Sequence, residues 1–184
     1  MQPRPLPPRV PVEDYLAGEQ ASQVRHEYVD GAVFAMGGAS DRHNLLAGNL
    51  YVRLSTGLPE SCQVFMSDMK VRIRTAEQDV FYYPDVVVAC DPADRDRYVR
   101  ERPVLVAEVL SASTERVDLF EKLFFYQRLE SLEEYLVIAQ DFREVRVYRR
   151  GERWRPLLAT EGDLRLESVG LTLTLDELYR RTGL

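Results

Sequence analysis

The stretch PVLVAEVLSAST, residues 103–114, decides how this chain is interpreted. Residues 103–110 are apolar except for Glu108, and a short, nearly continuous apolar run is typical of a strand buried on both faces. A carboxylate in such a strand is unfavourable unless a positive charge or hydrogen bonds compensate for its lost hydration. We therefore expect a partner for Glu108 elsewhere in the chain.

The composition is that of one soluble domain. The chain has 184 residues, of which 45% are hydrophobic and 29% charged, enough apolar mass for a sizeable core. We find neither a signal peptide nor an apolar run of about 18 residues. We therefore predict an extended, proline-rich arm over residues 1–10, a single domain over 11–184, and a cytoplasmic protein without membrane partners.

The two cysteines, Cys62 and Cys90, lie in apolar, strand-like surroundings. Their spacing matches neither a zinc site nor a disulfide framework. We predict that both are small core residues.

The formal net charge of −6 argues against a protein that coats nucleic acid, because phosphate neutralisation needs a basic surface. A nuclease can nevertheless combine an acidic body with one local basic track. A candidate track contains six arginines: Arg143, Arg146, Arg149, Arg150, Arg153 and Arg155. The alternative is a solvated hairpin face.

Periodicity predicts helices and strands in mixed order. The expected helices are residues 12–18, 41–57, 114–129 and 176–181. The expected strands are a hairpin around an Asp-Gly turn at 26–36, one bent strand or two over 62–66 and 69–74, and single strands at 80–89, 103–110, 134–140 and 144–150. This order indicates an α/β or α+β fold around one central, largely antiparallel sheet.

Glu108 and Asp85 are expected to lie close together. If the strand that begins after Asp85 pairs antiparallel with the strand that ends at Leu110, Val86 lies near Ala107. Asp85 and Glu108 then meet at the same edge of the sheet.

Two carboxylates at one partly desolvated position repel each other unless a positive charge lies between them. A divalent cation is the simplest remedy, and oxygen ligands suit Mg²⁺ or Mn²⁺. Asp85 and Glu108 are therefore candidate metal ligands. The alternative is that Glu108 is neutralised by an arginine such as Arg72 or Arg74, or that it caps a backbone amide.

Lys122 is the candidate positive group. At 100° per residue it shares a helical face with Leu119, Tyr126 and Leu129, so its stem is predicted to pack over the sheet. There its ammonium could position or deprotonate a water, or stabilise charge on a phosphate. The alternative is an exposed pair with Asp118 that contributes about 0.3–0.5 kcal/mol.

These residues carry a resemblance to known proteins. Pro84 and Asp85, a strand that carries Glu108, and a nearby lysine resemble the PD-(D/E)XK nuclease superfamily. More closely, an ordered set covering most of residues 11–180 resembles the Uma-two family of restriction-endonuclease-like proteins: EYVDG at 27–31, His43, YPDVVV at 83–88, EVLSAST at 108–114, Asp118 with Lys122 and Tyr126, and EYLVI at 134–138.

The resemblance implies a magnesium-dependent phosphodiesterase with a central mixed sheet flanked by helices, and with Asp85 and Glu108 as metal ligands. One position departs from the superfamily pattern. Leu110 stands where a lysine is expected, two residues after the glutamate. Lys122, on the following helix, is then the counterpart by position and not by motif.

Two further residues are candidates for the site. The resemblance places Glu27 in the same cleft, whereas its position in a hairpin is equally compatible with solvent. His43 could hold a water or a phosphate, or could simply be a helix-start residue bonded to the backbone.

We therefore predict that the chain hydrolyses DNA phosphodiester bonds with Mg²⁺ or Mn²⁺, with Asp85, Glu108 and Lys122 at the centre and Glu27 and His43 at the rim. The rival is a catalytically inactive nuclease-fold module that binds nucleic acid or serves assembly. A serine hydrolase lacks the glycine-flanked turn around the nucleophile. The alternating leucines of residues 171–175 are a candidate edge for a homodimer.

Overall fold

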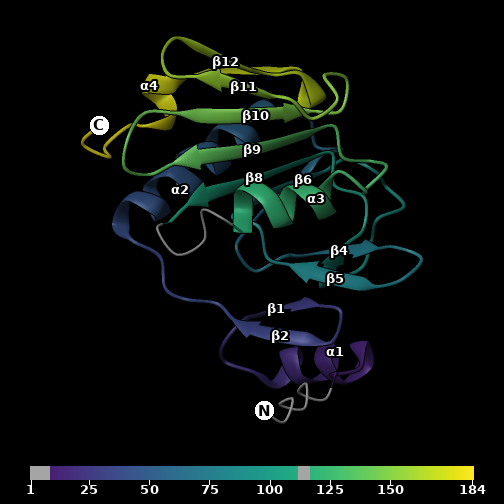
Figure 1. The fold of residues 1–184 in the computed structure, drawn as a ribbon. Helices are drawn as coiled ribbons and strands as arrows, with labels where there is room; N and C mark the ends of the chain where they lie inside the picture. Colours follow the sequence, from purple (N-terminus) through teal and green to yellow (C-terminus); the bar gives the residue numbers. More distant parts are fainter. Residues whose placement is uncertain (1–8, 112–116) are drawn as a thin grey trace, which may run out of the picture.

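The computed structural model describes residues 9–111 and 117–184, which form two main β-sheets and a small third one with helices around them (Figure 1). The helical segments are α1 (Val12–Ala21), α2 (Asp41–Gly57), the π-helix η1 (Val117–Lys122), α3 (Leu123–Tyr126), the 3-10 helix η2 (Glu167–Val169) and α4 (Leu175–Leu178). Most of the predicted arm at 1–10 lies outside the described residues.

The larger sheet has six strands in the order β11-β10-β9-β8-β6-β3. In chain order these strands are β3 (Gln63–Met66), β6 (Val86–Ala89), β8 (Leu105–Leu110), β9 (Glu134–Ala139), β10 (Val145–Arg149) and β11 (Pro156–Ala159). The β8–β9 pair is parallel and the other recorded pairs of this sheet are antiparallel. The mixed central sheet flanked by helices is therefore confirmed.

The second sheet has five strands in the order β2-β1-β5-β4-β7, and β12 pairs with β13 in a two-stranded third sheet. The strands are β1 (His26–Val29), β2 (Ala32–Ala35), β4 (Lys70–Arg74), β5 (Asp79–Tyr82), β7 (Val99–Arg100), β12 (Asp163–Leu166) and β13 (Leu171–Thr174). The expectation of one sheet was therefore wrong. Figure 1 shows α1, β1 and β2 at the opposite end of the molecule from β11 and β12.

The predicted strand at 80–89 is in fact two strands in different sheets, β5 and β6. Between them lies the segment Tyr83-Pro84-Asp85, and a proline has no N–H to continue a ladder. The chain passes here from the five-stranded to the six-stranded sheet. Asp85 therefore lies at the junction of the two.

Several local predictions are confirmed. The hairpin of β1 and β2 turns at Asp30 and Gly31, both with positive φ, as a tight two-residue turn requires. The helix predicted at 41–57 is α2, and Ser40 caps it by accepting the N–H of His43. The helix predicted at 12–18 is longer, since α1 continues past Gly18 to Ala21.

The helix predicted at 114–129 is only partly described. Residues 112–116 lie outside the described part, η1 and α3 follow, and the chain turns after Tyr126. The alternating leucines of β13 are buried in the core and β13 pairs with β12, so the homodimer stays a prediction. Every helix in 9–111 and 117–184 is too short or too polar to cross a bilayer.

Side chains of β8 alternate between two cores. Ala107 and Val109 pack in the cluster formed with α2, β13 and α4, whereas Val106 and Leu110 pack in the cluster formed with α3. Glu108 therefore faces the α3 side of the six-stranded sheet.

Cys62 and Cys90 pack against the core, as predicted, but the expectation that they form no disulfide was wrong, because they are bonded to each other. Gln63 pairs with Ala89 across β3 and β6, so the two cysteines are the next facing pair along the ladder. Their separation of 28 residues in the sequence hides this proximity. Disulfides are rare in cytosolic proteins, so this pair runs counter to the cytoplasmic expectation.

The arginine-rich segment is largely neutralised by carboxylates. The ion pairs are Arg143–Asp176, Arg146–Glu144, Arg149–Glu134 and Arg150–Glu133. This pairing favours the hairpin-face interpretation over the basic track.

Candidate active site

Glu108 is buried in β8, with 3% of its surface exposed. Its Oε1 accepts hydrogen bonds from Lys122 Nζ at 3.0 Å and from the Tyr126 hydroxyl at 3.1 Å. Both donors come from the helical segment η1–α3, which covers this face of the sheet (Figure 1). The alternative partners Arg72 and Arg74 bind Asp79 and Glu101 instead.

Asp85 lies opposite Glu108. Val86 pairs with Ala107, and one further step of this antiparallel register joins Asp85 to Glu108. Asp85 Oδ2 accepts the N–H of Val109 at 2.7 Å and lies 3.2 Å from His43 Nε2. The register and the bond from Val109 place Asp85 next to Glu108 in the sheet, as predicted.

Lys122 joins two elements through two carboxylates. Its Nζ lies 3.0 Å from Glu108 Oε1 and 3.0 Å from Glu27 Oε1, so it links β8 to β1. Only 5% of Lys122 is exposed, so it is not a solvent-facing residue. The alternative pairing with Asp118 falls on a side chain outside the described part. Glu27 points into the cluster and not into solvent.

His43 reaches the cluster from the first turn of α2. Its backbone N–H donates to the capping Ser40, as expected for a residue at a helix start, and its ring lies against Asp85. That this ring holds a water or a phosphate stays a prediction. The helix start thereby places an imidazole at the junction of the two sheets.

Tyr82 and Glu121 belong to the site and were not predicted. The Tyr82 hydroxyl donates to Glu121 Oε1 at 3.1 Å, and Lys122 Nζ lies 5.4 Å from the centre of the Tyr82 ring. Glu121 and Lys122 end the π-helix, a geometry that is frequent at functional sites. The sequence feature that could have pointed to this contact is Tyr82 itself, a polar hydroxyl in the apolar strand that leads to Pro84.

The cluster carries more negative than positive charge. Within the described residues, Glu27 and Glu108 share Lys122, while Asp85, next to Glu108 in the sheet, lies against His43. Burial, followed by the charge of Glu108, raises the pKa of Tyr126, and burial, followed by Glu121, raises the pKa of Tyr82. Both phenols therefore remain protonated donors at neutral pH.

The donor set suits a hard divalent cation with few protein ligands. Magnesium is commonly held by one or two carboxylates, with water in its other positions, and Asp85 with Glu108 fits that pattern. Among residues 9–111 and 117–184 no group of three or more His, Cys, Asp or Glu side chains has a metal-binding arrangement. A site of the zinc type, with three or four protein ligands, does not fit.

Comparison with known proteins gives three findings. Residues 12–176 match the family model described as "Uma2: Putative restriction endonuclease". Two Synechocystis sp. proteins are each 35% identical: "Uncharacterized protein slr1290", with 94% of this chain and 93% of that protein covered, and "Uncharacterized protein sll1609", with 76% and 81% covered. A crystal structure of "a putative nuclease belonging to DUF820" from Anabaena variabilis has a TM-score of 0.70 over 86% of this chain and 91% of that chain, at 14% identity, and thus shares the fold.

Proposed function

The chain belongs to the Uma2 family of restriction endonucleases, and from this membership and the acid–lysine cluster we propose that it is a metal-dependent endonuclease that hydrolyses DNA phosphodiester bonds. The observation that carries the proposal is one buried lysine shared by two carboxylates, beside a third acid in register with one of them.

Asp85 and Glu108 would hold Mg²⁺ or Mn²⁺. When bound, such an ion would supply positive charge to the phosphate oxygens and acidity to a coordinated water. Neighbouring groups hold the two ligands in place. The Tyr126 hydroxyl binds Glu108, and the His43 ring and the backbone N–H of Val109 bind Asp85.

Lys122 is the group proposed to orient the attacking water. A buried lysine among carboxylates can position a nucleophile or stabilise charge on the phosphate. Glu27 also binds the Lys122 ammonium, so acids from both sheets fix its position beside Glu108.

The test is cleavage of plasmid DNA by the purified protein with Mg²⁺ or Mn²⁺. Wild-type protein should nick or linearise the plasmid, and Asp85→Ala should not. Equal cleavage by both proteins would trace the activity to a contaminant and reject the assignment.

A non-catalytic binding module is the second candidate. Leu110 at the usual lysine position and the net charge of −6 favour it. Calorimetric titration with Mn²⁺ separates the two candidates, because the enzyme should bind the ion and Glu108→Ala should abolish that binding. A homodimer, in which each copy cuts one strand, is tested by the molar mass in solution.

A further inference from the structure

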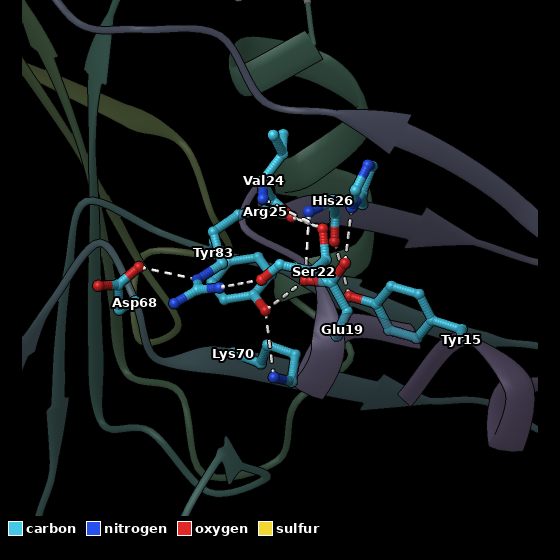
Figure 2. Close-up of polar contacts among 9 residues, drawn as sticks. All are labelled: Tyr15, Glu19, Ser22, Val24, Arg25, His26, Asp68, Lys70 and Tyr83. Carbon is cyan, nitrogen blue, oxygen red and sulfur yellow. Dashed lines mark hydrogen bonds and ion pairs between the residues drawn. The ribbon is translucent and has the colours of Figure 1, made fainter. Parts of the chain in front are cut away.

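Figure 2 shows a second polar cluster, between α1 and the five-stranded sheet. It lies on the opposite face of that sheet from the candidate site. Neighbouring residues of a strand point to opposite faces, so Glu27 faces Lys122 while His26 faces α1. In the same way Tyr82 faces Glu121, whereas Tyr83 faces α1. His26 and Tyr83, the sequence neighbours of Glu27 and Tyr82, thus form a rear cluster behind the candidate site.

Glu19 of α1 is the centre of this rear cluster. It is buried, its Oε1 lies 2.7 Å from His26 Nδ1, and its Oε2 accepts the His26 N–H at 3.3 Å. The same Oε2 accepts the Tyr83 hydroxyl at 2.8 Å, and that hydroxyl accepts Lys70 Nζ at 3.1 Å. One carboxylate therefore ties β1 to the segment after β5.

Helix α1 holds both backbone groups of His26. Tyr15, one turn before Glu19, donates its hydroxyl to the His26 carbonyl at 2.7 Å. Residues four apart lie on the same helical face, so Tyr15 and Glu19 act together.

The contacts of Glu19 with His26 and Tyr83 form a clamp at the point where β1 and the segment after β5 separate. Tyr28 pairs with Phe81, and continuing this register puts Glu27 opposite Tyr82 and His26 opposite Tyr83. After Tyr83 the chain leaves through Pro84 toward Asp85 and the other sheet. Glu19 therefore bridges the two strands at the point where their ladder ends.

We propose that Glu19 is a positioning residue that sets the separation of the Glu27 and Asp85 carboxylates across the junction of the two sheets. The inference deepens the proposed function and rests on it. Glu27 follows His26 directly, and Asp85 follows Tyr83 across a proline whose φ is fixed, so a shift at the clamp is passed to both acids.

The charge of Glu19 suits this role. Burial opposes its ionisation, but hydrogen bonds from Tyr83 and His26 outweigh burial and hold the pKa of Glu19 below its usual value. Glu19 is therefore ionised at neutral pH, and bonds to a charged acceptor are stronger than neutral ones.

The first experiment measures Mn²⁺ affinity by calorimetry in wild type, Glu19→Gln and Glu19→Ala, at a temperature where circular dichroism shows each to be folded. Loss of a group hydrogen-bonded to a metal ligand commonly weakens metal binding about 10- to 100-fold, and Glu19, which acts through the neighbouring residues, should fall at the lower end. We expect about a tenfold loss for Glu19→Ala, and a smaller one for Glu19→Gln, which keeps one acceptor oxygen.

Glu134→Gln is the matched control. Glu134 is a second buried, multiply bonded carboxylate, and its partners are Arg149, Glu167 and Ser168, none of which belongs to the candidate site. It should lose stability while its Mn²⁺ affinity stays that of wild type. Measurable Mn²⁺ binding of equal affinity in wild type and both Glu19 variants would overturn the proposal.

The second experiment needs no metal. In a crystal structure of metal-free Glu19→Ala, or of Glu19→Gln where the alanine variant does not fold, the contact of 3.0 Å between Lys122 Nζ and Glu27 Oε1 should lengthen beyond hydrogen-bond distance. An unchanged contact would reject the positioning role. Absence of Mn²⁺ binding in wild type with a lengthened contact would reject the proposed function while supporting the role of Glu19.

Discussion

Glu108 and Glu134 are both buried carboxylates in neighbouring parallel strands, yet their surroundings differ. Glu134 accepts bonds from the Arg149 guanidinium, from the backbone N–H groups of Glu167 and Ser168, and from the Ser168 hydroxyl. Glu108 shares its lysine with Glu27 and has Asp85 opposite it in the sheet.

The comparison shows that burial of an acid does not by itself mark a functional site. The Glu134 cluster gives one buried carboxylate an arginine, which also lies 3.6 Å from the exposed Glu167, and several neutral donors. Among the described residues, the Glu108 cluster brings Glu27 and Asp85 close to a buried acid beside Lys122 and His43, and a bound cation would stabilise such a group of acids. The poorly exposed acids near Glu108, and not the depth of its burial, distinguish the two.

The largest expected effect is a difference in plasmid cleavage between variants of Glu108 and Glu134. Glu108→Gln should lower Mn²⁺-dependent plasmid cleavage by more than about 100-fold, because it removes a proposed metal ligand. Glu134→Gln should cleave at the wild-type rate when both are assayed well below their unfolding temperatures. Equal loss in the two variants would mean that the comparison reports only stability.

The next effect separates metal binding from chemistry at the Glu108 cluster. Lys122→Met should lower cleavage by about 10²- to 10⁴-fold, the range for loss of a group that handles a proton in the reaction. Its Mn²⁺ binding by calorimetry should persist, since the carboxylates remain. Wild-type cleavage by this variant would remove Lys122 from the mechanism.

The variant Glu134→Gln, which should keep its cleavage activity, should lose thermal stability. Breaking a buried ion pair costs about 3 kcal/mol or more, because it leaves Arg149 without its main partner. For a chain of this size we expect the thermal midpoint of Glu134→Gln to fall by about 6–12 °C. Calorimetric or circular-dichroism melts measure it, and an unchanged midpoint would contradict a structural role for this acid.

The contribution of Glu19 should depend on pH. Its pKa is lower in the folded protein than its usual 4.5, so the stabilisation is present above pH 4.5 and is lost as the pH falls through the folded-state value. The difference in unfolding free energy between wild type and Glu19→Gln should stay level from pH 7 to about 5 and shrink below that. Urea titrations at several pH values test this, and a difference that grows on acidification would be the wrong sign.

The smallest effect is expected at an exposed pair in the same rear cluster. Arg25 Nε lies 3.0 Å from Asp68 Oδ1 on the surface. Such pairs contribute at most about 1 kcal/mol. Arg25→Ala should therefore leave Mn²⁺ affinity unchanged and shift the urea midpoint only slightly; a loss of affinity like that of Glu19→Ala would extend the clamp to the surface.

Some features could be predicted because they depend on neighbours in the sequence. The Asp-Gly turn, the capped helix after Ser40 and the alternation of β8 each follow from local residue chemistry. The register of Asp85 and Glu108 also followed, since one antiparallel pairing fixes every later pair along the two strands.

Other features depend on contacts between distant segments. The pairing of Cys62 with Cys90, the neutralised arginines and the clamp by Glu19 each need a register or a packing that no local pattern contains. The interruption of a strand at Pro84 could be predicted from the sequence. The passage of the chain into a second sheet at this point could not.

The sequence by itself determined that a charged residue would lie in a buried strand and that Asp85 would be its neighbour, because strand alternation and antiparallel pairing are short-range rules. Only the tertiary structure decided that Glu27 and Glu108 share one lysine, and that α1 holds the rear of the site. Those contacts join elements far apart in the chain, whose relative placement is set by the packing of two sheets and not by the order of residues within either one.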